Sequence, residues 1–331
     1  MTAARPIILM VTLGGTISMT ATAGRGLAPT LQASDLVQGL QDALGERCTV
    51  EPISFRTMPG ASLGFEDMAA LVDLLAARFA AGAAGAVVVH GTDTIEETVF
   101  LLDLCLPPTR AVVVTGAMRG AEAAGADGPA NLLAALMVAS DPLCADLGAL
   151  VVMNDQLHPA RLVRKAHTAL PSAFVSDPGG PIGAVIEGRV RLHAKPVRNP
   201  ARRPLAAPSS DYPVALVKPT LGDDGRLIAA LPGLGFRGVV VEAMGAGHTP
   251  ESWAGPLEAL AAKMPVVLAS RTAAGRTFRG TYGFAGSERD LLQRGLVPSG
   301  DLSAVKARLL LQALLTADAS RPDIEAAFDR F

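Results

Sequence analysis

Two short segments of the sequence combine hydroxyl groups with glycines directly after an apolar run. Residues 12–17 read T-L-G-G-T-I, and residues 90–98 read H-G-T-D-T-I-E-E-T. In the first segment the glycine pair allows close backbone approach and presents the hydroxyl of Thr16 beside exposed N–H groups. That hydroxyl could act as a nucleophile, but a tight turn or a phosphate-binding loop would use the same residue types. The segment fits neither of the phosphate-binding patterns G-x-G-x-x-G and G-x-x-x-x-G-K-[ST].

The second segment offers more chemistry, because it carries three threonines and three carboxylates. It follows the apolar run at residues 87–89 and leads directly into a predicted helix. Helix capping alone can explain such a pattern, with Thr94 as the N-cap and Glu97 completing a capping box. The capping and chemical interpretations are compatible, because a cap can hold Thr94 while Thr92 and Asp93 face a ligand.

The charge of the chain restricts its partners. The 331 residues carry a formal net charge of −2, and the basic residues form no run. Nucleic-acid-binding proteins and polybasic membrane proteins need a concentrated positive patch. We therefore expect neither nucleic acid nor membrane as a partner, and a small neutral or zwitterionic ligand fits better.

The hydrophobic half of the composition predicts no membrane span, since no stretch of about 18 consecutive apolar residues occurs. The apolar residues 6–13 are too short for a secretory signal peptide, so we expect a cytoplasmic protein. Cys48, Cys105 and Cys144 are widely spaced without a C-x-x-C pattern. They are expected to be buried small hydrophobes, and neither a zinc site nor a disulfide framework is predicted.

The elements that must position the two segments alternate between short apolar runs and longer amphipathic stretches. This alternation predicts βαβ units and a largely parallel sheet in a larger N-terminal α/β domain, residues 1–193. The predicted strands are residues 7–13, 50–55, 86–90, 111–116 and 148–153, and the predicted helices are residues 34–44 and 65–79. Parallel α/β sheets bind ligands at the carboxyl ends of their strands, which is where both segments lie.

The second half of the chain predicts a linker and a smaller domain. A chain of this length suggests about two domains, and five prolines between Pro196 and Pro213 place a linker at residues 194–213. Residues 214–331 then repeat the alternation on a smaller scale, as a second α/β domain. Its predicted strands are residues 214–218, 238–243 and 266–269, and its predicted helices lie near residues 251–263 and 302–316.

Further motifs connect both segments to one family. Residues 116–119 read G-A-M-R and residues 126–129 read A-D-G-P. With these motifs the chain resembles bacterial L-asparaginases and asparaginase-glutaminases, and the likeness covers nearly the whole chain. The resemblance implies a flavodoxin-like N-terminal domain and an amidohydrolase that needs no metal or cofactor. It also implies a small amino-acid substrate, L-asparagine with L-glutamine as the alternative.

The resemblance assigns a role to each residue of the two segments. Thr16 resembles the family's acylated nucleophile, and Thr92, Asp93 and Lys165 resemble its second catalytic cluster. A threonine hydroxyl needs a base or a hydroxyl relay to react at neutral pH, and a lysine beside an aspartate can provide one. Asp93 would also bind the substrate's α-ammonium. The substrate-binding positions implied by the resemblance are Gly15, Gly60, Ala61, Ser62, Gly91, Thr92, Asp93, Ala117, Met118 and His248.

The chain departs from the family pattern around the substrate carboxylate and in the second domain. Gly60 stands where the family has a serine, so backbone N–H groups near Gly60 and Ala61 are expected to bind the carboxylate, with Ser62 offering a hydroxyl two places on. His248 stands where the family often places an amide side chain that reaches a neighbouring subunit. Glu288 resembles a glutamate that is also donated across a subunit boundary. A homotetramer, built as a dimer of dimers, follows from this resemblance.

The largest departure is a missing tyrosine near Gly26, where the family usually has one that takes the proton from the nucleophile. The chain has only two tyrosines, Tyr212 and Tyr282. We expect Tyr282 to serve instead, because it lies six residues before Glu288 in a glycine-rich segment that could carry both side chains to Thr16. The flanking Arg279 would lower the pKa of the phenol and help it act as a base. Three alternatives remain open: an amidase that prefers L-glutamine, one that prefers a D-isomer, and a non-catalytic amino-acid-binding protein.

Overall fold

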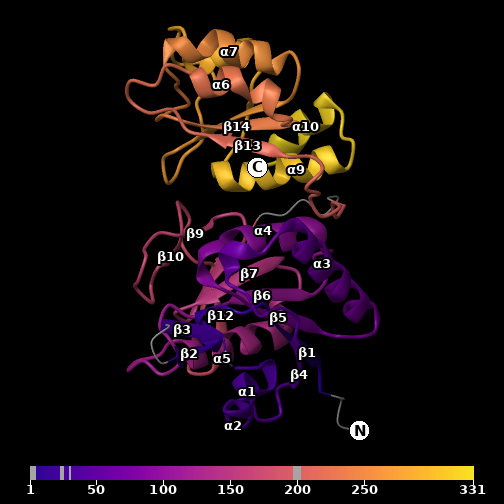
Figure 1. Ribbon diagram of the computed structural model, residues 1–331. Coiled ribbons are helices and arrows are strands. Elements are labelled where there is room, and N and C mark those ends of the chain that lie inside the picture. Colours follow the sequence, from indigo (N-terminus) through magenta and orange to yellow (C-terminus); the bar gives the residue numbers. More distant parts are fainter. Residues whose placement is uncertain (1–4, 23–25, 30, 197–202) are drawn as a thin grey trace. The chain divides into compact units, whose positions relative to one another are not determined.

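The computed structural model describes residues 5–22, 26–29, 31–196 and 203–331. The chain divides into two compact units, Met1–Pro204 and Leu205–Phe331 (Figure 1). The division falls inside the linker predicted at residues 194–213, whose exact bounds stay a prediction. Within the described residues, no helix is both long and apolar enough to cross a membrane.

An eight-stranded sheet forms the centre of the N-terminal unit. The strand order is β12-β11-β8-β7-β6-β5-β1-β4. Strands β4, β1, β5, β6 and β7 are parallel, and β8, β11 and β12 run antiparallel at one side. The bounds are β1 (Ile7–Thr12), β4 (Thr49–Ser54), β5 (Gly85–Val89), β6 (Ala111–Thr115), β7 (Ala149–Met153), β8 (Gln156–Pro159), β11 (Gly183–Ile186) and β12 (Arg189–Leu192).

The register of the parallel strands aligns the ends that matter for the site. Thr12 pairs with Ser54 on one side and Val89 on the other, and Val89 pairs with Thr115. The last residues of β4, β1, β5 and β6 therefore lie in one row. The loops that follow these strands leave the sheet along the same edge.

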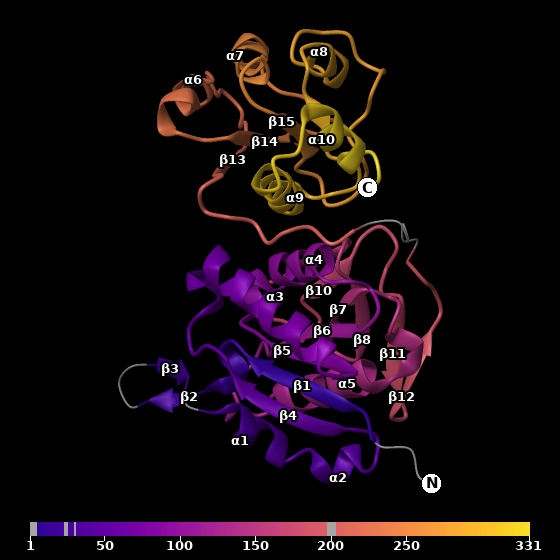
Figure 2. The ribbon, with the colours of Figure 1, turned by 90° about the vertical axis from the view of Figure 1, so that its right-hand side faces the viewer.

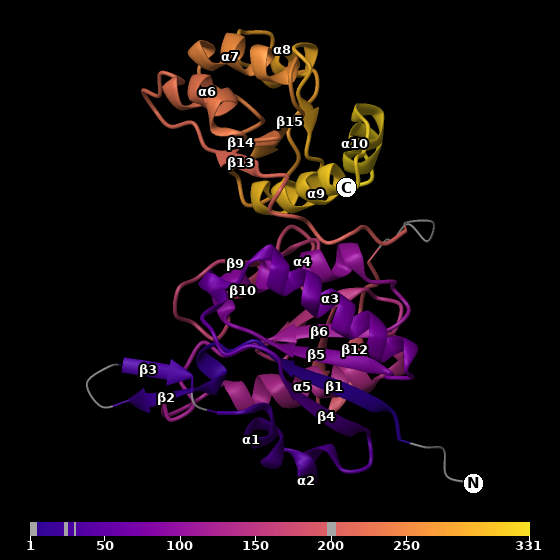
Figure 3. The same ribbon diagram turned by 45° about the vertical axis from the view of Figure 1, so that its right-hand side comes forward.

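Helices cover both faces of this sheet, so its strands are apolar on both sides (Figures 2 and 3). The helices α3 (Phe65–Ala80) and α4 (Ile95–Cys105) lie on one face. The other face carries α1 (Ala33–Gln38), α2 (Gln41–Leu44) and α5 (Gly128–Ser140). On that second face, Ile8 and Met10 of β1 join the core cluster that contains Leu132 and Leu136 of α5.

One predicted helix is divided in two. The sequence predicts a continuous helix over residues 34–44, but α1 ends at Gln38 and α2 begins at Gln41. Gly39 forms the C-cap of α1, where its low helix propensity favours a break. The prediction of one helix was wrong.

Short elements complete the N-terminal unit. Three 3₁₀ turns follow the strand ends: η1 (Thr16–Ser18), η2 (Gly60–Ser62) and η3 (Thr92–Thr94), and η4 (Pro142–Cys144) follows α5. Two hairpins pair β2 (Met19–Thr22) with β3 (Gly26–Pro29), and β9 (Val163–Lys165) with β10 (Phe174–Ser176). The three cysteines are free and buried, as predicted.

The C-terminal unit is a smaller α/β domain around a four-stranded parallel sheet, in the order β13-β14-β15-β16. Its core packs Trp253 and Leu257 against Val239 and Val241. The bounds are β13 (Val214–Val217), α6 (Arg226–Ala230), η5 (Leu231–Leu234), β14 (Gly238–Ala243), α7 (Glu251–Ala261), β15 (Val266–Ser270), α8 (Glu288–Gln293), β16 (Val297–Pro298), α9 (Ala304–Thr316) and α10 (Arg321–Phe328). The predicted fold class, a large parallel-sheet domain followed by a smaller α/β domain, is confirmed.

Candidate active site

Three glycines bring the loops after β1, β4 and β5 into backbone contact. A Cβ atom at Gly15 would lie 2.5 Å from the backbone N of Gly91, and one at Gly91 would lie 3.1 Å from the N of Gly60. Any side chain at Gly15 would therefore overlap the neighbouring backbone. Gly15 also has φ 97° and ψ 174°, a conformation that is essentially restricted to glycine. The glycines predicted at the site thus allow the three loops to meet.

Thr16 and Thr92 lie on either side of this contact. Each follows directly after a contacting glycine, Gly15 or Gly91, and each is the first residue of its 3₁₀ turn. Thr16 is half-buried and Thr92 is buried. The two predicted catalytic threonines are therefore held on one edge of the sheet, next to the contact between their loops.

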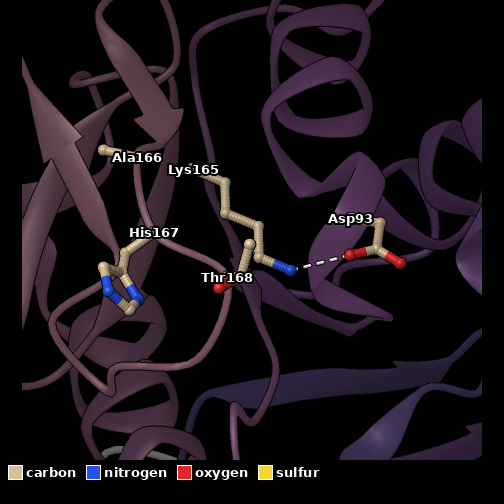
Figure 4. A pocket seen from close by; sticks show the side chains of 5 residues that line it. All are labelled: Asp93, Lys165, Ala166, His167 and Thr168. Atoms are coloured by element: carbon tan, nitrogen blue, oxygen red, sulfur yellow. Dashed lines mark hydrogen bonds and ion pairs between the residues drawn. The ribbon is translucent and has the colours of Figure 1, made fainter.

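Lys165 connects the second threonine to an aspartate from a distant part of the chain. Its Nζ atom donates to Thr92 Oγ1 at 2.9 Å. The same Nζ atom donates to Asp93 Oδ1 at 2.7 Å (Figure 4). The side chain of Lys165 is 16% exposed and that of Asp93 is 71% exposed. Because Thr92 Oγ1 accepts from the lysine, the hydroxyl proton of Thr92 can point at another acceptor.

The hairpin β9–β10 fixes the start of the Lys165 side chain. Lys165 pairs with Phe174, and its backbone N–H donates to Glu96 Oε1 at 3.3 Å. Glu96 belongs to the first turn of α4, the helix that follows η3. Two kinds of bond therefore join the hairpin to the segment that carries Thr92: the backbone N–H of Lys165 binds Glu96, and the side chain of Lys165 binds Thr92 and Asp93.

An open pocket of about 480 Å³ adjoins the Lys165 cluster. It is lined by Asp93, Lys165, Ala166, His167 and Thr168 (Figure 4). The exposed carboxylate of Asp93 is thus accessible to a small ligand, whereas the ammonium of Lys165 is mostly covered. This division suits an aspartate that binds a cation and a lysine that acts on a neighbouring hydroxyl.

Thr94 does not cap its helix with its side chain. It occupies the N-cap position of α4, but no side-chain capping bond forms there. Its hydroxyl donates instead to the carbonyl oxygen of Gly60 at 3.1 Å. The predicted capping box from Thr94 to Glu97 was therefore wrong, because Thr94 ties the loop after β5 to the loop after β4.

The expected carboxylate-binding loop lies beside these contacts. Gly60 is buried, and Ala61 and Ser62 are exposed. A Cβ at Gly60 would lie 3.0 Å from Thr94 Oγ1 and 3.2 Å from the Gly91 carbonyl oxygen. A serine here would be crowded against the loop after β5, which favours a glycine at this position.

A fourth loop, after β6, closes on the same row of strand ends. A Cβ at Gly116 would lie 2.5 Å from the carbonyl oxygen of His90. The backbone N–H of Met118 donates to both carboxylate oxygens of Asp127, at 3.1 and 3.0 Å. Ala117 is buried and Met118 half-buried, so the structure brings these predicted substrate-binding residues to the same sheet edge.

The remaining predicted residues lie together in the C-terminal unit. Glu288 is fully buried, and its Oε1 atom accepts from the backbone N–H groups of Thr281 at 2.8 Å and Tyr282 at 2.9 Å. Its Oε2 atom lies 3.2 Å from His248 Nε2. Burial alone would raise the pKa of Glu288, but the bonds from Tyr282, Thr281 and His248 outweigh it and hold the pKa below its usual value. Glu288 therefore anchors the loop that carries Tyr282.

Tyr282 is 42% exposed and packs edge-on against His248, with 4.8 Å between ring centroids. Arg279, which was expected to assist its phenol, forms an ion pair with Asp329 at 2.7 Å. The expectation that Arg279 acts on Tyr282 is therefore not supported. Gly26, where the family's tyrosine is missing, lies in β3 beside residues 23–25, which fall outside the described residues.

The sequence analysis missed the side chains that hold the threonine-bearing loops in place through hydrogen bonds. Glu96, Asp127 and Thr94 hold the loops through bonds to backbone groups. The only sequence signal for Glu96 was its place in a carboxylate-rich helix start, where capping gave a sufficient explanation.

Comparisons with known proteins identify the family of the chain. Residues 7–198 match the family model "Asparaginase, N-terminal", and residues 213–328 match "Glutaminase/Asparaginase C-terminal domain". The chain is 38% identical to a probable L-asparaginase of Deinococcus radiodurans, over 99% of this chain and 98% of the relative. It is 32% identical to an L-asparaginase of Bacillus licheniformis, over 93% of this chain and 95% of that one.

A solved structure extends the likeness to the fold. The crystal structure of a probable cytoplasmic L-asparaginase from Campylobacter jejuni matches with a TM-score of 0.87 and 26% identity, and the match covers 99% of this chain and 100% of that one. Both domain models match in the expected order along the chain. The chain therefore belongs to the asparaginase family.

Proposed function

We propose that the chain hydrolyses the side-chain amide of L-asparagine to L-aspartate and ammonia, with Thr16 as the nucleophile. The observation that carries the proposal is the bonding of Lys165 Nζ to both Thr92 and Asp93, beside the contact between the loops that hold the two threonines. The names of the relatives support L-asparagine as the substrate.

The first half of the reaction forms an ester on Thr16. Its Oγ attacks the amide carbon, and the amide C–N bond breaks. The leaving nitrogen takes the proton that Thr16 loses and departs as ammonia. Thr92 is placed to relay this proton, since its oxygen accepts from Lys165 while its own hydrogen is free to be donated.

The second half of the reaction returns Thr16 to its hydroxyl form. Water adds to the acyl carbon, the ester bond to Thr16 breaks, and the proton from water returns to the Thr16 oxygen. Both halves pass through an oxyanion, which backbone N–H groups near the Gly15 loop would stabilise. The positive charge of Lys165 lies one hydrogen bond from Thr92.

Substrate binding would use the accessible carboxylate of Asp93 for the α-ammonium of the amino acid. The α-carboxylate would bind backbone N–H groups around Gly60 and Ala61, because Gly60 has no side chain to offer. Ala117 and Met118 would line the side-chain amide end of the site.

We further propose a homotetramer, a dimer of dimers, in which His248 and Glu288 of one subunit complete the site of a neighbour. In that assembly Glu288 would act by holding the backbone of Tyr282 and the ring of His248 in place. A cytoplasmic location is proposed on the likeness to the probable cytoplasmic enzyme of Campylobacter jejuni.

Ammonia release from L-asparagine, L-glutamine and D-asparagine tests the proposed function. We expect L-asparagine to have the highest kcat/KM. A pocket distinguishes substrates that differ by one methylene by only about 1–3 kcal/mol, so L-glutamine should be hydrolysed measurably but about 10- to 100-fold less well. Equal kcat/KM for the two amides would overturn the preference, and no ammonia from any of the three would overturn the activity.

A further inference from the structure

The ring of His90 is completely buried. His90 directly follows the last residue of β5 and begins the loop that carries Thr92. Its Nδ1 atom lies 2.6 Å from the carbonyl oxygen of Gly91, and its Nε2 atom lies 3.0 Å from Thr98 Oγ1. A carbonyl oxygen can only accept a hydrogen bond, so Nδ1 must carry a proton.

The ring carries only this one proton at neutral pH. Burial lowers the pKa of His90 to about 4, which leaves a neutral imidazole. Its Nε2 atom is then an acceptor for the hydroxyl of Thr98, which favours this nitrogen at 3.0 Å over the weaker acceptor Met68 Sδ at 3.7 Å. Thr98 lies in α4 and is 4% exposed, so water has little access to this bond.

The bond from His90 fixes the peptide between Gly91 and Thr92. That peptide is trans, so its N–H points opposite to its C=O. Because the carbonyl is held by the buried ring, the N–H of Thr92 is directed away from the ring. The same peptide leads into Thr92, whose hydroxyl accepts from Lys165 at 2.9 Å.

The ring also supports the neighbouring loop. A Cβ at Gly60 would lie 3.3 Å from His90 Cε1 and 3.2 Å from the Gly91 carbonyl oxygen. The edge of the ring therefore lies against Gly60, close to the carbonyl that Thr94 holds. A rotated ring or a rotated Gly91–Thr92 peptide would disturb both loops at once.

We propose that Thr98 and His90 form a positioning pair for Thr92. The Gly91 carbonyl sets the Nδ1–H tautomer of His90, and the Thr98 hydroxyl donates to Nε2 and holds the ring in place. The Nδ1–H then holds the Gly91–Thr92 peptide in its reactive orientation. The proposal rests on the function proposed above. In the opposite tautomer, the lone pair of Nδ1 would face the Gly91 carbonyl at the same 2.6 Å, and the peptide would rotate away. Both side chains are buried, so the pair acts through the peptide.

Two substitutions at Thr98 separate the hydroxyl from the volume of the side chain. Thr98→Val keeps the shape and removes the donor, whereas Thr98→Ser keeps the donor and removes a methyl group. A displacement of about 1 Å in an active site can cost about 100-fold in rate, so we expect kcat of Thr98→Val to fall about 10- to 100-fold with KM within threefold of the wild type. Thr98→Ser should retain kcat within threefold.

A matched control tests whether loss of any buried hydroxyl has the same effect. Ser299 is 1% exposed in the C-terminal unit, where its hydroxyl donates to the Leu302 carbonyl at 3.1 Å. Ser299→Ala should lower the melting temperature and leave kcat unchanged.

Equal losses of kcat in Thr98→Val and Thr98→Ser would overturn the proposal, because packing would then be the cause. Wild-type kcat in Thr98→Val would also overturn it.

The tautomer can be measured without activity. Long-range ¹H–¹⁵N correlation spectra of the histidine rings distinguish a protonated Nδ1 from a protonated Nε2. We expect a protonated Nδ1 for His90 in the wild type, and in Thr98→Val an Nε2 resonance that shifts toward that of an unbonded imidazole nitrogen. A protonated Nε2 in the wild type would overturn the proposal, and it would do so even if Thr98→Val failed to fold. If the wild type released no ammonia from L-asparagine, the proposed function would fail, and the spectra alone would decide the tautomer.

Discussion

The contact between Gly15 and Gly91 makes Gly15→Ala the most informative backbone change. The new Cβ would lie 2.5 Å from the Gly91 nitrogen, so the two loops must separate by about 0.9 Å to reach the 3.4 Å at which ordinary contact begins. A misplacement of about 1 Å can cost about 100-fold in rate, which corresponds to about 2.7 kcal/mol of barrier. We therefore expect kcat for L-asparagine to fall about 100-fold.

The same substitution strains the backbone, and this effect needs its own control. An alanine in a glycine-only conformation costs about 1–3 kcal/mol, or about 2–12 °C in melting temperature for a unit of this size. Gly82 also has a positive φ, of 106°, but nothing lies within 4 Å of a Cβ placed there. Gly82→Ala should therefore lose stability and keep kcat. Stopped-assay ammonia release with calorimetry on both variants distinguishes the effects, and a folded Gly15→Ala protein with kcat within threefold of the wild type would refute the reasoning.

Three further predictions concern single side chains of both units. Lys165→Met should lower kcat by about 100-fold or more. The control Lys195→Met removes a surface ion pair with Asp146 and should leave kcat unchanged. Similar kcat in both variants would contradict the role of Lys165. Burial lowers the pKa of both His90 and His158 to about 4. As the pH falls, the unfolded chain therefore binds protons at these histidines before the folded chain does, and the free energy of unfolding should fall by about 3 kcal/mol per histidine between pH 6.5 and 4. Chemical denaturation that shows constant stability from pH 6.5 to 4.5 would be inconsistent with neutral buried rings. Tyr282→Phe should lower kcat by about 100-fold if the phenol replaces the missing tyrosine, and wild-type turnover would eliminate that role.

The parallel part of the fold could be predicted from the sequence because each central strand is buried on both faces. Runs such as Val87–Val89 are continuously apolar and end at a glycine or a polar residue, which marks both the strand and its loop. The antiparallel strands β8 and β12 were missed, since each has only four residues and mixed polarity. Short strands of that kind carry little pattern.

The candidate site was predictable only in part, because most of its bonds join residues far apart in the sequence. The role of Lys165 came from the family resemblance, since no local spacing relates it to Thr92, 73 residues away. Thr94 was assigned to a cap because the local pattern favoured one, whereas its actual partner, Gly60, lies 34 residues away. The burial of Glu288 depends on the fold of its loop and left no local signal.

The rate of ammonia release by Thr16→Ala tests the central claim most directly. The measurement uses L-asparagine at a saturating concentration and a variant whose melting temperature matches that of the wild type. The proposed acyl-enzyme requires the Thr16 oxygen, so kcat should fall by about 1,000-fold or more. A folded Thr16→Ala protein with kcat within tenfold of the wild type would contradict the proposed mechanism.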